Sequence, residues 1–179
     1  MSDVRIIVDH IKLDYQGLFK LNDFFKTIDA WLFERGLEKR TNKNFEQNTP
    51  KGKFIEWEIA SWKKITPYVR YIYKLRVLIY GLKKVEVAKD KENLQLDNGH
   101  ILIYFDGYIE FDYEHRWDET PILVFLRTLY DKFIYKVYTE RFENRLTYDL
   151  HQLYDVIERF LNMYRHYRPV SRVPHFAGT

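Results

Sequence analysis

The sequence predicts an α+β protein in which a curved antiparallel sheet wraps around a long C-terminal helical segment. Three observations predict this class. One alternating segment and one helical segment open the chain, and several alternating segments separated by turn residues follow, up to residue 113. From Thr120 to Tyr167 the apolar residues recur at helical spacing instead. Helices set apart from a run of antiparallel strands are typical of α+β domains.

The first strand is expected over residues 4–15. Apolar residues alternate in 4–8 and again in 11–15, but the two sets have opposite parity, so we expect a β-bulge near Asp9 and His10. Gly17 is expected to turn the chain. A helix should follow, with Asn22 as its cap and Gly36 at its C-terminal end, and with one apolar face formed by Leu21, Phe25, Ile28 and Leu32.

The sheet is expected to continue through residue 113. Residues 37–45 form a polar candidate for an edge strand, and 54–62 and 68–80 alternate clearly. Residues 85–87 suggest a further short strand, followed by a turn at 90–92. The run Asp97-Asn-Gly-His100 is a signal for a two-residue hairpin, with a long return strand over 101–113.

The C-terminal third begins with a helix-start signal at Pro121. Proline has a φ that suits the first turn of a helix, and it lacks the N–H that would need a partner there. Its apolar stripe shifts by five residues between Val137 and Phe142, which predicts a kink or a short break between Thr139 and Thr147. Pro169 ends the helix. We therefore expect a single domain over residues 1–168 and a C-terminal tail over 169–179.

Composition excludes several classes of function. The 179 residues suit one domain with a sizeable core. The absence of cysteine excludes disulfides, thiol catalysis and cysteine metal sites. A net charge of +3 is too small for a dedicated nucleic-acid binder, so no nucleic-acid partner is expected. No signal peptide precedes the strand pattern at Val4 and charges interrupt every apolar run, so we expect a cytoplasmic protein without a transmembrane segment.

The order of these elements, from Val4 to about Tyr164, resembles the helix-grip fold of the START/Bet v 1-like (SRPBCC) superfamily. The resemblance lies in element order and involves no diagnostic motif. It implies a curved sheet around a C-terminal helix that encloses an apolar cavity, and hence ligand binding. One helix instead of two after the first strand, and a doubled C-terminal helix, depart from that pattern; the extra segment 121–143 would fill the cavity or cover its mouth.

Aromatic residues are the candidate ligand-binding residues. The cavity lining is expected to comprise Trp57, Tyr71, Tyr73, Phe105, Phe111 and Phe133. Simple core packing explains the same pattern, because apolar strand faces are normally core. Buried Tyr hydroxyls need partners, so Tyr71 and Tyr73 are suited to orient the polar end of a ligand.

The remaining sequence patterns indicate neither catalysis nor metal binding. No phosphate loop and no nucleophile motif is present, and none of the histidines has the spacing of a metal motif: His10, His100, His115, His151, His166 and His175. We therefore predict no catalytic residue, no metal and no cofactor. Two rows of charges, Arg70, Lys74 and Arg76 and then Asp106, Glu110, Asp112 and Glu114, are expected to pair across the solvent face of the sheet. The basic, aromatic stretch 164–175 fits either a solvated tail or contact with an anionic surface.

Two classes of function remain open, with a third behind them. The first is a non-enzymatic binding domain for an apolar or amphipathic small molecule, held between the sheet and the C-terminal helix. The second is a protein-interaction or assembly module, such as a homodimer, that uses the apolar helix 122–138. The third is a cyclase-like or hydrolase-like use of the cavity.

Overall fold

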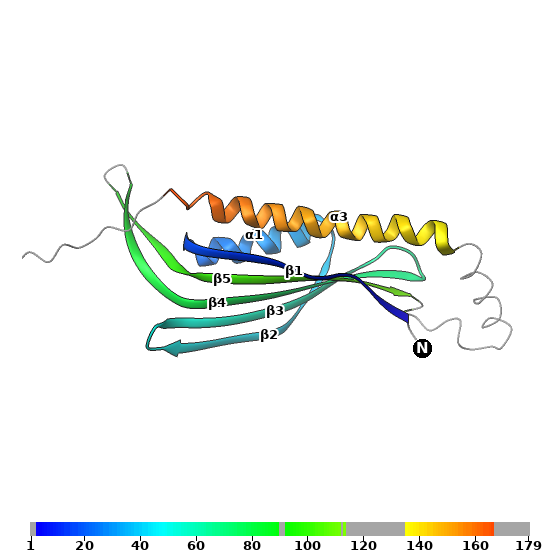
Figure 1. Cartoon of the computed structure of the whole chain (residues 1–179), viewed down its shortest axis with the longest axis horizontal. Coiled ribbons are helices and arrows are strands. Elements are labelled where there is room, and N and C mark those ends of the chain that lie inside the picture. The colour runs from blue at the N-terminus through cyan, green and yellow to red at the C-terminus, as the bar shows by residue number, and fades with distance from the viewer. Residues whose placement is uncertain (1–2, 90–91, 112, 114–134, 167–179) are drawn as a thin grey trace, which may run out of the picture.

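The computed structural model describes residues 3–89, 92–111, 113 and 135–166. These residues form a five-stranded antiparallel sheet and two helices (Figure 1). The strands lie in the order β1-β5-β4-β3-β2 across the sheet. The elements in chain order are β1 (Asp3–Phe19), α1 (Leu21–Glu34), β2 (Glu38–Thr49), β3 (Gly52–Lys64), β4 (Val69–Lys89), β5 (Glu92–Phe111) and α3 (Tyr135–Asn162).

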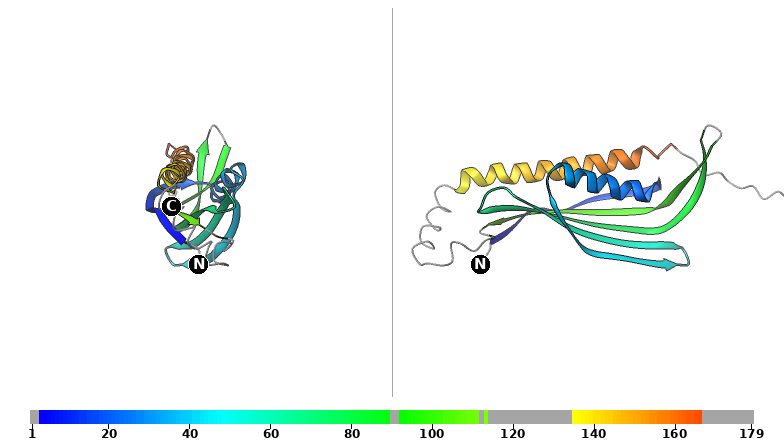
Figure 2. Two further views of the ribbon diagram at one scale, coloured as in Figure 1. Left: turned by 90° about the vertical axis from the view of Figure 1, so that its right-hand side faces the viewer. Right: turned by 180° about the vertical axis from the view of Figure 1, so that it is seen from behind.

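Both helices cover the same face of the sheet, and among the described residues no helix lies on the opposite face (Figures 1 and 2). Near their shared hairpin, β4 and β5 bend toward the side of the helices (Figure 1). The α+β class and the covering of the sheet by the C-terminal helix are therefore confirmed.

The core lies between the sheet and the helices. The apolar stripe predicted for α3 is the buried one, because Leu146, Leu150, Leu153 and Ile157 are all 0% exposed. Burying each such side chain contributes about 2–3 kcal/mol, so this stripe anchors α3 to the sheet. On α1 the buried residues are Phe24, Ile28, Trp31 and Leu32.

Helix α3 lies close against the sheet at Gly107 on β5. A Cβ placed there would lie 2.6 Å from Leu150 Cδ1 and 3.0 Å from Leu146 Cδ2. A glycine in the middle of a strand often marks such a contact. At Gly107 the missing side chain allows α3 to pack directly on the backbone of β5.

The first strand contains the predicted bulge. Its pairing with β5 shifts between Val8 and Ile11, so Asp9 and His10 lie opposite a single residue, Asp106. The turn expected at Gly17 is wrong, because β1 stays extended and paired to its end at Phe19.

The helix α1 begins two residues earlier than predicted, and Asn22 is not its cap. Lys20 occupies the N-cap position and makes no side-chain hydrogen bond there. Instead, the N–H of Leu21 donates to Asp97 Oδ2 on β5 at 2.9 Å. A carboxylate from β5 thus accepts a hydrogen bond from one of the free N–H groups of the first turn. Its negative charge also interacts favourably with the positive end of the helix dipole. At the other end, Gly36 has a φ of 64° and follows the helix as predicted.

The hairpin predicted at Asp97–His100 is wrong. Strand β5 runs through these residues. All four pair with β1, and Asp97, Asn98 and His100 also pair with β4. The chain reverses further back, where Lys89 pairs with Glu92, in agreement with the turn predicted at 90–92. Residues 85–87 therefore extend β4 and do not form a separate strand.

Of the kink or short break predicted between Thr139 and Thr147, the break is wrong, since α3 is one continuous helix over both residues. A kink within this helix stays a prediction. The predicted helical segment at 120–134, the tail 169–179 and the candidate residue Phe133 lie outside the described residues. The single-domain boundary at residue 168 stays a prediction.

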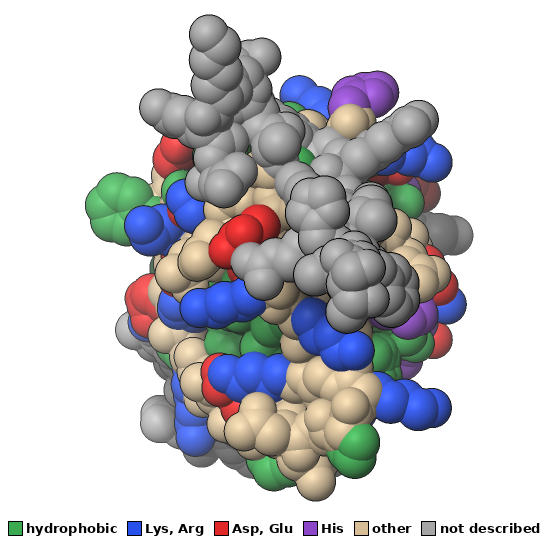
Figure 3. Space-filling model, turned by 90° about the vertical axis from the view of Figure 1, so that its left-hand side faces the viewer, with side chains coloured by type: hydrophobic (Ala, Val, Ile, Leu, Met, Phe, Trp, Pro, Cys, Tyr) green, Lys and Arg blue, Asp and Glu red, His purple; other side chains and the backbone are tan. Residues whose placement is uncertain are grey.

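The face of the sheet away from α1 and α3 carries several cross-strand ion pairs. Arg70 Nε donates to Glu110 Oε2 at 2.9 Å, and Arg76 Nη2 donates to Glu56 Oε1 at 3.1 Å. Lys74 pairs with Glu58 at 3.2 Å. The predicted cross-strand pairing is confirmed for Arg70 and Glu110, whereas Lys74 and Arg76 pair with β3. Seen from the end with the β2–β3 turn, Lys and Arg side chains are interspersed with Asp and Glu (Figure 3). No helix within the described ranges is long and apolar enough to cross a membrane.

Candidate functional site

A small cavity lies beyond the C-terminal end of α1, between the sheet and α3. At Gly36 the chain leaves α1 toward β2, so past this point α3 covers the sheet without α1 (Figure 2). The cavity measures about 50 Å³. Its walls come from α1, β3, β4, α3 and the adjoining loops: Arg35, Leu37, Lys63, Ile65, Tyr71, Tyr73, Arg145 and Asp149.

Two tyrosines of β4 form the inner wall. Tyr71 and Tyr73 are alternate residues on the helix-facing side, 0% and 1% exposed, and their rings meet edge to face at 6.3 Å. The hydroxyl of Tyr71 donates to the carbonyl oxygen of Phe142 at 3.0 Å, and that of Tyr73 donates to Asp149 Oδ2 at 3.1 Å. Both acceptors belong to α3, so the hydroxyls link the sheet to the helix.

Asp149 is the centre of a polar network at the mouth of the cavity. Its Oδ1 accepts from Arg35 Nη1 at 2.5 Å, and Arg35 Nη2 also donates to Gln152. Lys63 Nζ donates to the carbonyl oxygen of Arg35 at 2.6 Å and satisfies a C-terminal carbonyl of α1. The network therefore joins the end of α1 to β3 and to α3.

Burial changes the acidity of both tyrosines. Loss of solvation raises the pKa of Tyr71 to about 12, while the positive charge of Arg145 opposes the rise. Burial also raises the pKa of Tyr73, and the negative charge of Asp149 adds to this effect. Both hydroxyls therefore stay protonated at neutral pH and use their protons on α3. Toward a ligand they offer acceptor lone pairs and ring edges.

Arg145 is the cation at this site whose guanidinium is not engaged. It lies one turn before Asp149 on α3 and is exposed, and its charge acts on Tyr71. Within the described part of the chain, its guanidinium has no hydrogen bond or ion pair. The cavity is thus lined by three cationic side chains and one carboxylate, and the carboxylate already accepts from Arg35 and Tyr73. The net charge of the lining is therefore positive, which suits an anionic ligand.

The structure brings together two of the predicted lining residues. Tyr71 and Tyr73 line the cavity, whereas three other residues pack within the core. Trp57 meets the ring of Phe25 at 4.7 Å, Phe105 meets Tyr154 at 5.8 Å, and Phe111 meets Tyr68 at 6.1 Å. Any role of these three in binding stays a prediction.

Sequence reasoning missed the charged residues of the site. Arg35, Lys63, Arg145 and Asp149 come from three separate elements, and no spacing along the chain links them. One signal was present for Asp149: it directly precedes Leu150 in the apolar stripe of α3, where a carboxylate at the edge of a core needs a partner.

A larger hollow of about 200 Å³ lies between β1 and the C-terminal half of α3. Polar side chains dominate its lining, including Asp14, Glu158 and Arg165. Asp14 is already bound by Lys12 at 3.0 Å and by His100 at 2.7 Å. This hollow has two carboxylates and one arginine, and it lacks the positive excess and the buried tyrosine wall of the smaller cavity.

Comparisons with protein-family models, with curated proteins and with solved structures gave no match.

Proposed function

We propose that this protein is a non-enzymatic binding domain for an amphipathic small molecule that carries an anionic group. The observation that carries the proposal is the guanidinium of Arg145, which stands without a partner among the described residues at a cavity with two further cations. Binding sites typically combine apolar walls with a few polar groups that fix orientation. Here Leu37, Ile65 and the tyrosine rings supply the apolar walls.

The size of the cavity defines which part of the ligand it holds. A volume of about 50 Å³ has room for a group of carboxylate or phosphate size, since one water occupies roughly 30 Å³. A whole ligand of this class needs several hundred Å³. The anionic head would therefore enter between Arg145 and the tyrosines, and the apolar part would lie outward, along the half-buried Leu37 and Ile65.

Calorimetric titration with three ten-carbon probes tests the proposal: decanoate, decanol and decyltrimethylammonium. We expect saturable binding of decanoate, weaker binding of decanol, and none of the cation. Because a hydrogen bond to a charged group contributes about 1.5–3 kcal/mol, Arg145→Gln should weaken decanoate binding about tenfold or more.

Arg141→Gln is the matched control, because Arg141 is exposed on the preceding turn of α3 and does not line the cavity. It should leave the affinity unchanged. Equal binding of all three probes, or equal losses in the two arginine variants, would contradict the proposal.

The other predicted functions rest on different parts of the chain. An assembly role for the helix 122–138 concerns residues mostly outside the described ranges and stays a prediction, as does a cytoplasmic location. The catalytic use of the cavity stays a prediction. Tyr71 lines the cavity, whereas the carboxylate of Glu110 is paired with Arg70 on the opposite face of the sheet.

A further inference from the structure

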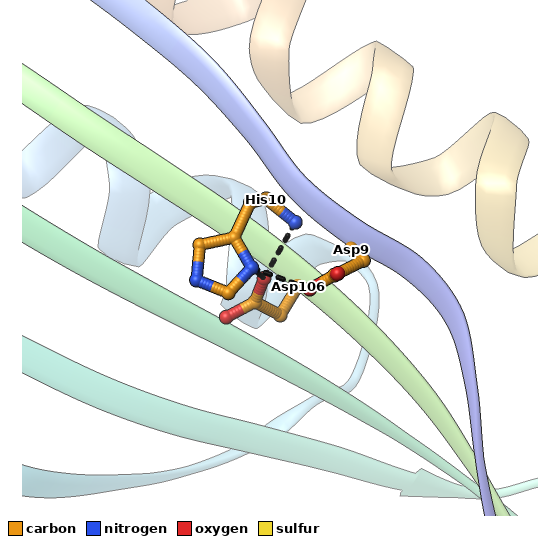
Figure 4. A group of neighbouring side chains, drawn as sticks. All are labelled: Asp9, His10 and Asp106. Carbon is orange, nitrogen blue, oxygen red and sulfur yellow. Dashed lines mark hydrogen bonds and ion pairs between the residues drawn. The ribbon is translucent and has the colours of Figure 1, made fainter.

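The bulge in β1 brings three potential metal ligands together on the face of the sheet away from α1 and α3. Val8 pairs with Gly107 and Ile11 with Phe105, so two residues of β1 face one residue of β5. His10 has a φ of 52°, and no other non-glycine residue in the described part of the chain has a positive φ. The side chains of Asp9, His10 and Asp106 point toward one another as a result (Figure 4).

Their donor atoms have the spacing of a shared ion site. One ligand atom from each of the three residues lies within 4.8 Å of the other two. The His10 Nδ1 atom is 3.4 Å from Asp106 Oδ1 and is hydrogen-bonded to Asp9 Oδ1. Ligands bound at about 2.0–2.2 Å to one metal ion are roughly 3–4.4 Å apart, so small side-chain rotations are enough to place an ion among them.

Asp106 is the least exposed of the three ligands. The residue is only 8% exposed, and its Oδ1 accepts from the backbone N–H of His10 at 2.8 Å. Its Oδ2 has no hydrogen-bond partner among the residues the structure describes. Lys74 stands opposite in the ladder, but its ammonium pairs with Glu58. Among the described residues, the buried side-chain polar atom without a partner is Ser61 Oγ, so Oδ2 of Asp106 reaches solvent and is available to a cation.

We propose that Asp9, His10 and Asp106 bind a divalent first-row transition-metal ion of the Zn²⁺ class. One imidazole nitrogen with two carboxylate oxygens suits such borderline ions better than Ca²⁺ or Mg²⁺, which prefer oxygen ligands alone. The ring of Tyr104 stands edge-on to His10 at 6.0 Å and restricts its rotation. Asp9 and His10 are largely exposed, so the remaining coordination positions of the ion face solvent. Lys74 is the nearby cation that opposes binding.

The same sheet face contains a natural control. His100 Nε2 lies 2.7 Å from Asp14 Oδ1, on the same two strands as the proposed site. This pair has an imidazole and one carboxylate but no second carboxylate, and Lys12 also holds Asp14. If any histidine–aspartate pair on this surface bound metal ions nonspecifically, the pair of His100 and Asp14 would bind them as well as the site at His10.

Titration of the full chain with ZnCl₂, followed by NMR of the histidine ring signals, tests the site. We expect one saturable site that shifts the His10 signals and leaves those of His100 unchanged. Co²⁺ should compete for this site and produce visible absorption bands.

Two variants separate binding from folding. His10→Asn removes the imidazole yet suits a positive φ, which asparagine tolerates, and Asp106→Asn keeps an acceptor for the His10 N–H. Loss of an outer-shell partner alone costs about 10–100-fold in metal affinity, so each variant should lose at least tenfold. His100→Ala should bind as the unaltered protein does. Absence of saturable binding, or an affinity unchanged by His10→Asn, or an equal loss in His100→Ala, would overturn the assignment.

Discussion

Tyr71 and Tyr73 show how one type of residue serves both the core and the site. Their rings fill the space beneath α3, and their hydroxyls bind two different groups on that helix. A buried hydroxyl that makes such a bond avoids a desolvation penalty of about 1–3 kcal/mol. The helix is therefore positioned over the cavity by directional contacts as well as by its apolar stripe.

The raised pKa of Tyr71 predicts a loss of stability in alkali. Its value is about 12 in the folded protein and about 10 in the unfolded chain. Because the folded-state pKa is the higher, its contribution to stability is complete below about pH 10 and is lost as the pH rises toward 12. In urea unfolding, the free energy of unfolding should fall more steeply over this range than in Tyr71→Phe.

Tyr148→Phe is the control for this effect, because Tyr148 is 61% exposed on α3. It should keep the steep dependence on pH. Parallel curves for the unaltered protein and Tyr71→Phe would show that Tyr71 ionises normally in the folded state.

The sequence predicted the tyrosines of the site and missed its charges for a physical reason. Alternation along one strand determines which residues share a face, so Tyr71 and Tyr73 could be placed from sequence. Arg35, Lys63 and Asp149 meet only because α1 ends beside both β3 and α3. Likewise, the bulge at Asp9 and His10 was visible in the change of parity, but its partner Asp106 depends on the register between β1 and β5.

At the scale of elements, α3 shows what a shift in the apolar stripe means. A step of five residues moves the apolar side chains around the helix axis, but it breaks no backbone hydrogen bond. No glycine or proline lies between Tyr135 and Asn162, so nothing in the sequence stops the helix there. The shift of the apolar stripe therefore marks a change in the buried face of the helix, and it does not mark a break in the helix.

The predicted hairpin at 97–100 failed because of tertiary pairing. Asp97, Asn98 and Gly99 favour a turn locally, but here they lie in the middle of three paired strands. Asp97 is also engaged by the first turn of α1. Ladder bonds on both sides of β5 and this capping bond outweigh the local preference for a turn, as context often does for strand propensity.

The seating of α3 on Gly107 predicts that even one added methyl group disturbs it. Gly107→Ala would press Cβ against Leu150 and Leu146, and such overpacking costs about 1–3 kcal/mol. Chemical denaturation should show this loss. If the cause is contact with α3, the loss in the double variant Gly107→Ala/Leu150→Ala should be smaller than the sum of the two single losses. Additive losses would contradict the contact.

At the scale of the whole molecule, stability should differ across the sheet. Strands β4 and β5 are paired on both sides and carry most of the buried strand residues. Strand β2 is an edge, and its residues from Glu38 to Asn48 are exposed on both faces. The strand that sequence reasoning identified as a polar edge is therefore the least supported part of the sheet.

Hydrogen exchange should report this gradient. Amide hydrogens of β4 and β5 are expected to exchange only on global unfolding, whereas those of β2 exchange through local opening with a smaller free energy. Mass spectrometry of peptides from 38–49 and from 69–79 would measure the difference. Equal protection of the two segments would mean that the sheet opens as one unit.

The order of the strands also constrains how the chain assembles. The first two strands, β1 and β2, stand at opposite edges of the sheet, and Asp3 pairs with Phe111. During synthesis, β2 to β5 can pair as successive neighbours, but β1 must wait for β5, the strand made last. Until β1 has paired with β5, the open side of β5 lacks its partner and can pair with another chain. A nascent or partly folded molecule is therefore most exposed to aggregation along β5, which in the finished protein is one of its best protected strands.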